Sequence, residues 1–436
     1  MCECTTMRLM NLPACWRIRE AMSDTIESGQ QDWFGERRPH ILMGVTSPQT
    51  TVVLVDRIRA FREAGYRVSL LSSPGELLNQ NGRDLGAEPC AIPMQRGISV
   101  LADCVALFRI WRLIGSLKPD IVEFSTPKAG LLGSIAARLC RVPVRIYFLR
   151  GLKLETSGGL KRFLLLSAEK VAAQCAHVVV CNSRSLRDRT LQCGIARESK
   201  LLVLGEGSSN GVNTKRFSQG PSRIREQLGI PNDATVVGFV GRLTRDKGLP
   251  ELLEAFASLL RCEPDAYLLL VGWFDASEDE LDLALRERIE SHPRVIQTGF
   301  VQDTAPYYRA MDLLVLPSWR EGFPNVVLEA SASGVPVVAT NCTGSRDAVV
   351  PGVTGLLIPP GEPDAIREAM RSLLHDPNRL RMAKAARAWV EEHFESSGVL
   401  GRTIAFYSSL MKPLARRLVQ RPERIVERAT GLSVSP

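Results

Sequence analysis

The chain has 436 residues, too many for one ordinary hydrophobic core and suitable for two domains of about 200 residues each. Its 45% hydrophobic and 23% charged residues exclude a disordered protein, and the sequence contains no run of 18 or more apolar residues that could span a membrane. The 11 cysteines form no CxxC pair, so we interpret them as reduced side chains of a cytosolic protein and expect no metal site.

The formal net charge of +8 comes largely from two segments. Arg138–Arg162 holds seven basic residues and one acidic residue, and Lys412–Arg428 holds six basic and two acidic ones. Such clusters suit anionic lipid headgroups, nucleic acid or a phosphate-bearing substrate, although each could also be a solvated basic face. We expect peripheral contact with an anionic membrane and no nucleic acid.

Residues 1–36 are polar and basic without a hydrophobic run, which predicts a poorly ordered N-terminal extension and no secretory signal. Met22 is an alternative start to Met1.

From residue 37 onward, strand-like apolar runs alternate with helical windows, and this alternation predicts parallel sheets with crossover helices. In the first half we expect strands at 40–45, 67–71, 120–124, 144–149, 177–181 and 200–204, and helices at 53–64, 128–139, 160–173 and 184–193. Glycine and serine are frequent in Gly205–Gly211 and Ser218–Ser222, which predicts a linker.

The same alternation restarts after the linker. We expect strands at 235–240, 267–271, 295–298, 312–316 and 335–340, and helices at 250–261, 278–289, 325–332, 364–374, 379–393 and 398–410. The predicted fold class is therefore α/β, with two Rossmann-like domains at 37–218 and 219–395 and a crossover helix with a basic tail at 396–436. Since ligands bind at the carboxyl ends of such strands, the two domains should face each other across a cleft.

Two carboxylates stand eight positions apart in the motif EGFPNVVLE. Glu321 lies in a turn after a strand, and Glu329 lies two turns into the helix that Pro324 and Asn325 open. The backbone N–H groups of residues 323–325 suit an anion or a sugar hydroxyl. A nucleotide sugar could lie along this helix with hydroxyl groups at both ends accepted by carboxylates.

A second motif, GRLTRDKG, follows the first strand of the second domain. The turn at Gly241 presents Arg242 and, five residues later, Lys247. Two cations there would neutralise a diphosphate and stabilise the charge that develops as it leaves. The motif is not the GxxxxGK[ST] phosphate loop, since Gly248 follows the lysine, and no GxGxxG fingerprint follows this strand, which argues against a nicotinamide enzyme.

Together with GFVQ and LPSWREGFPNVVLEASASGVPVVAT, these motifs resemble the retaining GT-B glycosyltransferase family 4. The resemblance extends over residues 40–410 and is strongest at 236–360. It implies that Arg242 and Lys247 clasp the diphosphate, that Glu321 holds donor sugar hydroxyls and that Glu329 holds the ribose. The further donor-binding residues that it implies are Gly241, Phe300, Val301, Gly322, Phe323, Pro324 and Asn325.

The first half resembles members that build bacterial capsule, exopolysaccharide or O-antigen units, through FSTPKAGLLG and LRGLK. This resemblance implies a UDP-sugar donor, a polyprenyl-diphosphate-linked acceptor and a cytoplasmic site at the inner face of the cell membrane. Lys128 is a candidate acceptor contact. Where many members have His-Gly, this chain has Arg150-Gly151, and the arginine could hold the sugar's C6 oxygen or an acceptor phosphate.

We therefore expect a hexosyltransferase that moves an N-acetylhexosamine or related hexose, and no metal or other cofactor, because no Asp-x-Asp follows a strand. One alternative is a non-catalytic GT-B subunit that binds a nucleotide sugar in an assembly complex. Another is a different reaction on a similar fold, such as nucleotide-sugar epimerisation.

Overall fold

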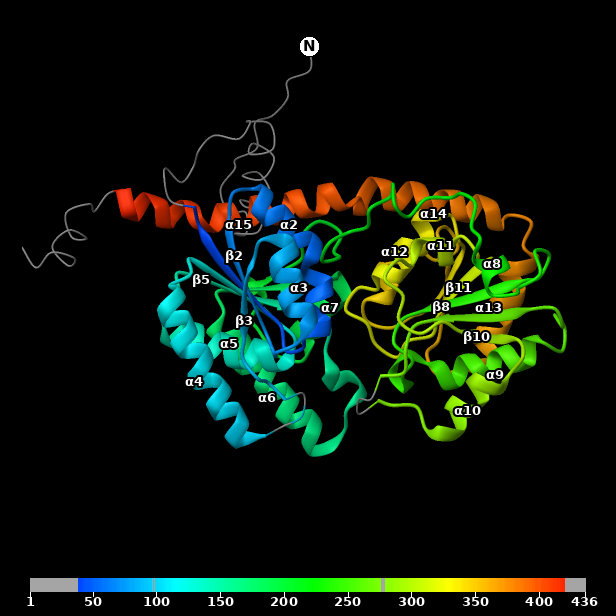
Figure 1. Cartoon of the computed structure of the whole chain (residues 1–436), viewed down its shortest axis with the longest axis horizontal. Coiled ribbons are helices and arrows are strands. Elements are labelled where there is room, and N and C mark those ends of the chain that lie inside the picture. Colours follow the sequence, from blue (N-terminus) through cyan, green and yellow to red (C-terminus); the bar gives the residue numbers. More distant parts are fainter. Residues whose placement is uncertain (1–37, 96, 98, 276–278, 420–436) are drawn as a thin grey trace, which may run out of the picture.

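The computed structural model describes residues 38–419 apart from 96, 98 and 276–278, and it describes side chains as far as Met411. The predicted N-terminal extension and the side chains of the basic segment Lys412–Arg428 lie outside the described residues. Two parallel α/β units lie side by side along the long axis, and two consecutive helices, α14 Arg379–Phe394 over the second unit and α15 Ser396–Val419 over the first, run along the same side of the molecule (Figure 1).

The first unit is built on a seven-stranded sheet with the order β3-β2-β1-β4-β5-β6-β7, in which every pairing is parallel. The strands are β1 His40–Gly44, β2 Arg67–Ser72, β3 Glu88–Ala91, β4 Ile121–Ser125, β5 Val144–Leu149, β6 Val178–Cys181 and β7 Leu201–Leu202. Because the chain order reverses between β1 and β4, right-handed crossovers place the helices on both faces of the sheet.

The helices of this unit are η1 Pro48–Leu54, α2 Val55–Glu63, α3 Glu76–Leu85, α4 Val100–Leu117, α5 Pro127–Leu139, η2 Lys153–Thr156, α6 Gly159–Cys175, α7 Arg184–Gln192 and η3 Glu198–Lys200. One apolar cluster holds Ile58 of α2, Leu78 of α3 and alternate strand residues such as Ile41 and Ile146. Two further clusters hold α4 with α5, and α6 with α7, so these helices share the opposite face.

The second unit is built on a six-stranded parallel sheet with the order β10-β9-β8-β11-β12-β13. Its strands are β8 Val236–Val240, β9 Tyr267–Val271, β10 Val295–Gln297, β11 Leu313–Leu316, β12 Val337–Thr340 and β13 Leu356–Ile358. Its helices are α8 Ile224–Gln227, η4 Arg245–Lys247, α9 Leu249–Leu259, α10 Leu283–Ser291, α11 Ala305–Tyr308, α12 Asn325–Ala332, η5 Ser345–Asp347, α13 Pro363–His375 and α14 Arg379–Phe394. The buried apolar side chains of this unit form a single cluster.

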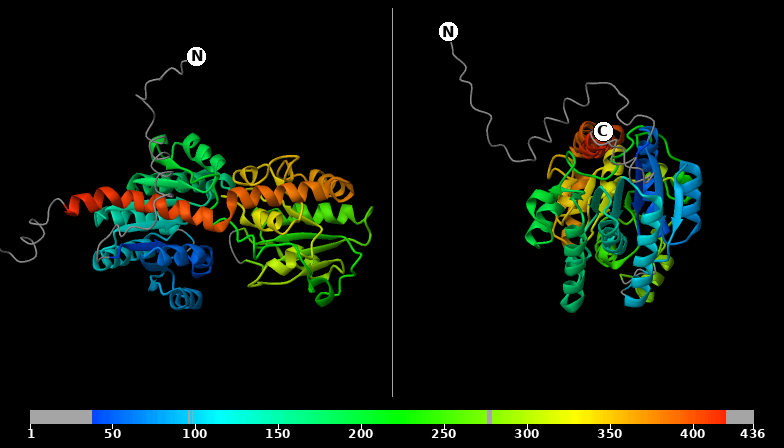
Figure 2. Two further views of the ribbon diagram at one scale, coloured as in Figure 1. Left: turned by 90° about the horizontal axis from the view of Figure 1, so that it is seen from above. Right: turned by 90° about the vertical axis from the view of Figure 1, so that its left-hand side faces the viewer.

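The last helix, α15 Ser396–Val419, crosses from the second unit back to the first (Figures 1 and 2). Phe406, Tyr407 and Met411 pack into the first unit's core beside α2. Where the helix begins, Val212 donates its backbone N–H to the carbonyl of Phe394 at 2.8 Å, and Ser396 donates to the carbonyl of Val212 at 3.0 Å. None of the helices in the described ranges is long and apolar enough to cross a bilayer.

The structure differs from the sequence-based expectations mainly between residues 72 and 119. We expected no element there, whereas the chain forms α3, β3 and α4. The periodicity of α4 was obscured because Val100, Leu101, Val105 and Phe108 are exposed on its outer side while Ala106, Ile110 and Ile114 face the core. The helix expected at 53–64 begins earlier as a 3-10 turn, the helix expected from 278 begins at Leu283, and β13 was missed.

Candidate active site

The residues of the two motifs meet because β8 and β11 are neighbours in the second sheet, so the loops after them lie next to each other. Gly248 ends η4 with a left-handed φ of 73°, and a Cβ atom there would lie 2.2 Å from the carbonyl oxygen of Pro317. Only glycine fits this approach. It holds the Arg242–Lys247 turn against the start of the Ser318–Glu321 loop.

Lys247 and Glu321 form an ion pair with 2.5 Å between Nζ and Oε1. The hydroxyl of Ser318 donates to the same Oε1 at 2.8 Å, and the side chains of Lys247 and Glu321 are only 17% and 13% exposed. The structure thus places a cation and a carboxylate that are 74 positions apart in direct contact.

The turn before Lys247 is anchored by a buried carboxylate. Asp246 accepts hydrogen bonds from Thr244 at 2.6 Å and from Arg320 at 2.8 Å. Burial raises the pKa of Asp246, but the Thr244 hydrogen bond and the charges of Arg320 and Lys247 outweigh it and hold the pKa below its ordinary value. The carboxylate is therefore charged at neutral pH and fixes the loop that carries Lys247.

Arg242 also has a carboxylate partner, since its Nη1 lies 2.6 Å from Oδ2 of Asp275. Both cations predicted to bind the diphosphate are thus paired with acidic side chains of the second unit. Because charge-assisted pairs of this kind are partly solvated here, a diphosphate with more negative charge could compete for the same donors.

Helix α12 begins at Asn325 after Pro324, and Val327 donates its backbone N–H to the carbonyl of Pro324 at 3.1 Å. The N–H groups before it, at the very start of a helix, have no acceptor within the helix. One turn further, the partly buried Glu329 accepts a hydrogen bond from the hydroxyl of Tyr308 at 2.7 Å. Burial raises the pKa of Glu329, and the Tyr308 hydrogen bond opposes that rise. Glu321 and Glu329 therefore lie at the start of one helix and along it, as the spacing predicts.

The other predicted donor-binding residues fall into two groups. Phe300 is 61% exposed and packs edge-on against Trp273 with 5.4 Å between ring centroids, and Val301 packs against the core. Phe323 is instead buried, with its ring 5.2 Å from that of Phe394 at the start of the crossover segment. Phe323 therefore contributes to the site by packing, which holds the EGFPN turn in place.

The carboxyl ends of the strands of the two sheets face each other, and the loops between them are in contact. A Cβ atom on Gly322 would lie 1.8 Å from the carbonyl oxygen of Arg150, so only glycine permits this approach. The hydroxyl of Ser208 donates to Oδ1 of Asn325 at 3.1 Å. The predicted glycine of the EGFPN motif thus touches the first unit at its predicted Arg-Gly pair.

Four further hydrogen bonds between the units were not predicted from the sequence. The backbone N–H of Ser185 donates to Asp347 at 3.1 Å, and the hydroxyl of Ser185 accepts from the N–H of Gly344 at 2.8 Å. Arg320 donates to the hydroxyl of Thr156 at 2.8 Å. The remaining tie is a hydrogen bond of 2.8 Å from Thr343 to Glu155. Arg320 stands directly before Glu321 in a quoted motif, but no sequence signal marks its partner or the residues of the other hydrogen bonds.

The two candidate acceptor contacts are held within the first unit. Lys128 pairs with Asp103 of α4 at 2.6 Å and is only 12% exposed. The guanidinium of Arg150 lies 4.8 Å from the ring centroid of Phe148, and two of its nitrogens, Nε and Nη2, are buried without a hydrogen-bond partner among the described residues. Burial, and then the nearby charge of Arg57, lower the pKa of Arg150 to about 10, so it remains a cation at neutral pH.

The basic segment Arg138–Arg162 does not form one surface, which corrects our interpretation of it as a single cluster. Arg138 and Arg141 are exposed at the end of α5, while Arg145 donates to the carbonyls of Cys175 and Val142 and Arg150 turns inward. The sequence could not show this, because the contact of Arg145 with Cys175 and the packing of Arg150 on Phe148 are tertiary contacts.

The comparisons with known proteins agree with this arrangement. Residues 49–207 match the model of the glycosyl transferase 4-like domain, and residues 234–376 match the model of the glycosyl transferases group 1. Over 370 residues, 84% of this chain and 96% of the relative, the chain is 35% identical to the capsular polysaccharide biosynthesis glycosyltransferase CapM of Staphylococcus aureus.

A second relative is the UDP-Gal:alpha-D-GlcNAc-diphosphoundecaprenol alpha-1,3-galactosyltransferase of Escherichia coli, 27% identical over 303 residues, which are 67% of this chain and 76% of the relative. Among solved structures, HepE of Anabaena in complex with UDP and glucose superposes with a TM-score of 0.72, covering 85% of this chain and 99% of that one. At 24% identity this likeness shows the fold alone.

The chain therefore belongs to the group 1, or family 4, glycosyltransferases with the GT-B fold. It is an enzyme of the glycosyltransferase class, as the motifs predicted.

Proposed function

We propose that this enzyme transfers an N-acetylhexosamine or related hexose, with retention of configuration, from a UDP-sugar to a polyprenyl-diphosphate-linked acceptor in bacterial surface polysaccharide synthesis. The observation that carries the proposal is the contact of Lys247 with Glu321 beside the N-terminus of α12. The capsular role of the Staphylococcus aureus relative and the lipid-diphosphate substrate of the Escherichia coli relative support the pathway.

On the donor side, Arg242, Lys247 and the first turn of α12 hold the diphosphate. Its negative charge displaces Asp275 from Arg242 and Glu321 from Lys247, and the freed Glu321 accepts hydroxyl hydrogen bonds from the sugar. Glu329 accepts from the ribose, and the exposed Phe300 with Val301 borders the nucleobase. This exchange keeps both cations neutralised before and after the donor binds.

In the transfer step, the bond between the anomeric carbon and the diphosphate oxygen breaks while the acceptor hydroxyl approaches from the same face. The new bond forms from the acceptor oxygen to the anomeric carbon, and the hydroxyl proton passes to the departing phosphate oxygen. Lys247 and Arg242 stabilise the growing negative charge, which is the task that electrostatic preorganisation performs best. We expect the reaction to proceed without a divalent metal.

On the acceptor side, the unpartnered N–H groups of Arg150 suit a phosphate oxygen, and the carbonyl of Arg150 lies against the donor loop. Lys128 would have to leave Asp103 to take part. Leu160, Phe163 and Leu164 of α6 are exposed beside Lys161 and Arg162, and this face would rest on the anionic inner face of the cell membrane.

UDP release measured with and without a lipid-diphosphate acceptor tests the proposal. Release that depends on the acceptor supports it, and the anomeric configuration of the product, read by NMR, tests retention. A nucleotide-sugar screen by thermal shift identifies the donor. Release from no nucleotide sugar with any lipid-diphosphate acceptor would overturn the proposal.

A further inference from the structure

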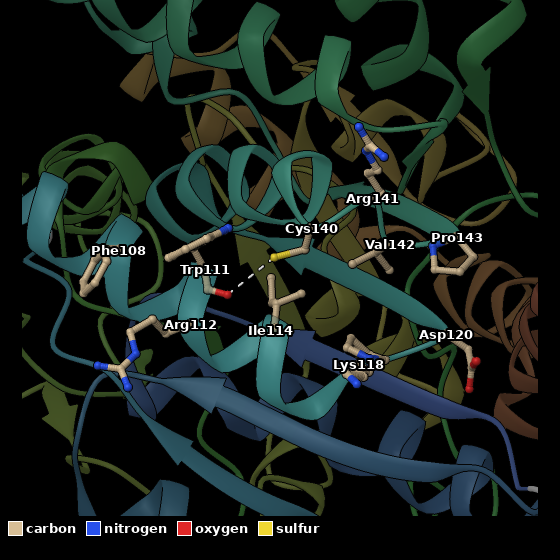
Figure 3. A pocket seen from close by; sticks show the side chains of 12 residues that line it. Phe108, Trp111, Arg112, Ile114, Lys118, Asp120, Cys140, Arg141, Val142 and Pro143 are labelled. Atoms are coloured by element: carbon tan, nitrogen blue, oxygen red, sulfur yellow. Dashed lines mark hydrogen bonds between the residues drawn. The ribbon is translucent and has the colours of Figure 1, made fainter. Parts of the chain in front are cut away.

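A pocket of about 760 Å³ lies on the first domain, at the amino ends of β4 and β5 (Figure 3). Asp120 precedes β4 and Pro143 precedes β5, so the pocket is at the sheet edge opposite the candidate active site. Its walls are the C-terminal half of α4 and the segment that joins α5 to β5. This volume is within the range of pockets that hold small ligands.

The inside of this pocket is apolar and aromatic. Trp111 and Phe108 of α4 lie together with 5.7 Å between ring centroids and are 42% and 54% exposed. Ile114 and Val142 form the buried floor. The surface continues along the outer side of α4 through Val105 and Leu101, which precede Phe108 by three and seven positions and so share its helix face.

Three cations surround this apolar interior: Arg112 of α4, Lys118 after α4 and Arg141 after α5. All three are exposed, and none forms a salt bridge with a residue in the described part of the chain. Asp120, the acidic residue of the lining, accepts the backbone N–H of His40 at 2.9 Å. The rim therefore carries net positive charge.

The backbone at two of these cations is unusual. Lys118 and Arg141 follow their helices with left-handed φ values of 45° and 54°. At the ends of α3, α7 and α12 the chain uses Gly86, Gly194 and Gly334 for the same conformation, with φ of 60°, 61° and 75°. A residue with a Cβ atom is strained in this conformation. Lys118 and Arg141 therefore both hold a strained backbone at the rim of the pocket.

We propose that this pocket binds one anionic phospholipid of the membrane. An acyl chain lies against Trp111, Phe108 and the outer side of α4, and the phosphate contacts the basic rim, on which Arg112, Lys118 and Arg141 stand on different sides of the pocket (Figure 3). The charge favours this occupant over a second copy of this chain, whose net charge is +8 and whose equivalent face is also basic. The site deepens the membrane contact of the proposed function and would anchor the first domain.

The pocket is not a second place for the acceptor's diphosphate. β4 separates the pocket at Asp120 from the candidate active site beyond Ser125, and five strand residues span about 17 Å. A lipid bound here therefore leaves the transfer site open. Loss of lipid binding in the pocket should weaken membrane attachment without changing the turnover of a short-chain, water-soluble acceptor.

Flotation of the full chain with phosphatidylcholine vesicles, with and without phosphatidylglycerol, tests the proposal. Arg112→Gln/Lys118→Gln/Arg141→Gln should lower affinity for the anionic vesicles by up to about 100-fold, since each of the three basic residues near an anionic surface contributes about fivefold. The control Arg371→Gln/Arg381→Gln/Lys384→Gln makes the same charge change on α13 and α14 and should retain binding. Equal losses of vesicle affinity in the two triple variants would overturn the proposal of a specific site.

Bromine-labelled acyl chains locate the lipid, because they quench nearby tryptophan fluorescence. Quenching should fall markedly in Trp111→Phe and remain in Trp389→Phe, whose ring packs in the second domain. Unchanged quenching in Trp111→Phe would contradict the proposal. Dimerisation in light scattering without lipid would also contradict it. Normal turnover of the soluble acceptor in the triple variant separates a failure here from a failure of the proposed function.

Discussion

The two domains share a fold but differ in what they leave exposed. The second domain gathers its buried apolar side chains in one core cluster, and its exposed Phe300 follows a strand at the site edge. The first domain leaves apolar side chains exposed along α4 and α6, among them Leu101, Phe108, Leu160 and Phe163. Large exposed apolar surfaces mark sites at which a partner binds. The comparison teaches that the second domain presents the groups for donor chemistry, while the first presents a surface for an apolar, anionic partner.

The charges follow the same division. In the second domain, Arg242 and Lys247 each face a carboxylate at the sheet edge. In the first domain, Arg112, Lys118 and Arg141 face solvent around an apolar pocket. Paired cations suit a ligand that can exchange with the carboxylates, and unpaired cations suit a permanently anionic surface.

The largest effect that the comparison predicts is at Lys247. Lys247→Ala should lower turnover by about 10²–10³-fold, because its charge is needed most as the diphosphate departs. Steady-state UDP release with the lipid-diphosphate acceptor measures this. Arg245→Ala removes a neighbouring cation that pairs with Asp282 instead, and it should retain turnover. Unchanged turnover in Lys247→Ala would refute its role.

The next largest effect concerns donor binding. Glu329→Ala should raise the Kd for UDP by about 10–100-fold, since a hydrogen bond to a charged acceptor contributes about 1.5–3 kcal/mol. Isothermal titration calorimetry measures the Kd. Glu254→Ala on the exposed side of α9 is the control and should bind UDP normally. Equal affinity in the two variants would remove Glu329 from the donor site.

A third experiment compares the apolar surfaces of the two domains. Leu160→Ser/Phe163→Ser on α6 should weaken binding to anionic vesicles by about tenfold or more, because each buried side chain contributes about 1.5–3 kcal/mol. Leu283→Ser/Leu380→Ser changes two side chains of the second domain that are 74% and 66% exposed, and vesicle sedimentation should not change. Vesicle binding that does not depend on salt, or an equal loss of vesicle binding in both variants, would contradict the difference between the two domains.

The smallest effect concerns pH. Burial raises the pKa of Glu329 and the Tyr308 hydroxyl lowers it, so Tyr308→Phe should raise this pKa further. If the carboxylate accepts the ribose hydroxyls, UDP binding is complete above the pKa and is lost as the pH falls through it. Tyr308→Phe should then match the wild type near pH 8 and bind several-fold more weakly near pH 5. Parallel pH profiles of the Kd would contradict this account.

The sequence by itself determined the motifs of the second domain and its longer elements, but not α8, α11 and β13. Strand β9 and helix α12 lie where their apolar patterns predicted them, because periods of 2 and 3.6 residues are local properties. The positions of Gly241, Gly248 and the EGFPN turn are equally local. The sequence also placed Glu321 in the turn before a helix and Glu329 within that helix, which is where they lie relative to α12.

Only the tertiary structure decided which distant side chains meet. The Lys247–Glu321 pair depends on β8 lying beside β11, and the contact of Gly322 with Arg150 depends on how the two sheets face each other. The pairing of Lys128 with Asp103 and the inward turn of Arg150 likewise follow from packing. The pocket forms where α4 and α5 end beside each other. Strand order and helix packing arise from long-range burial, which a local pattern of residues does not encode.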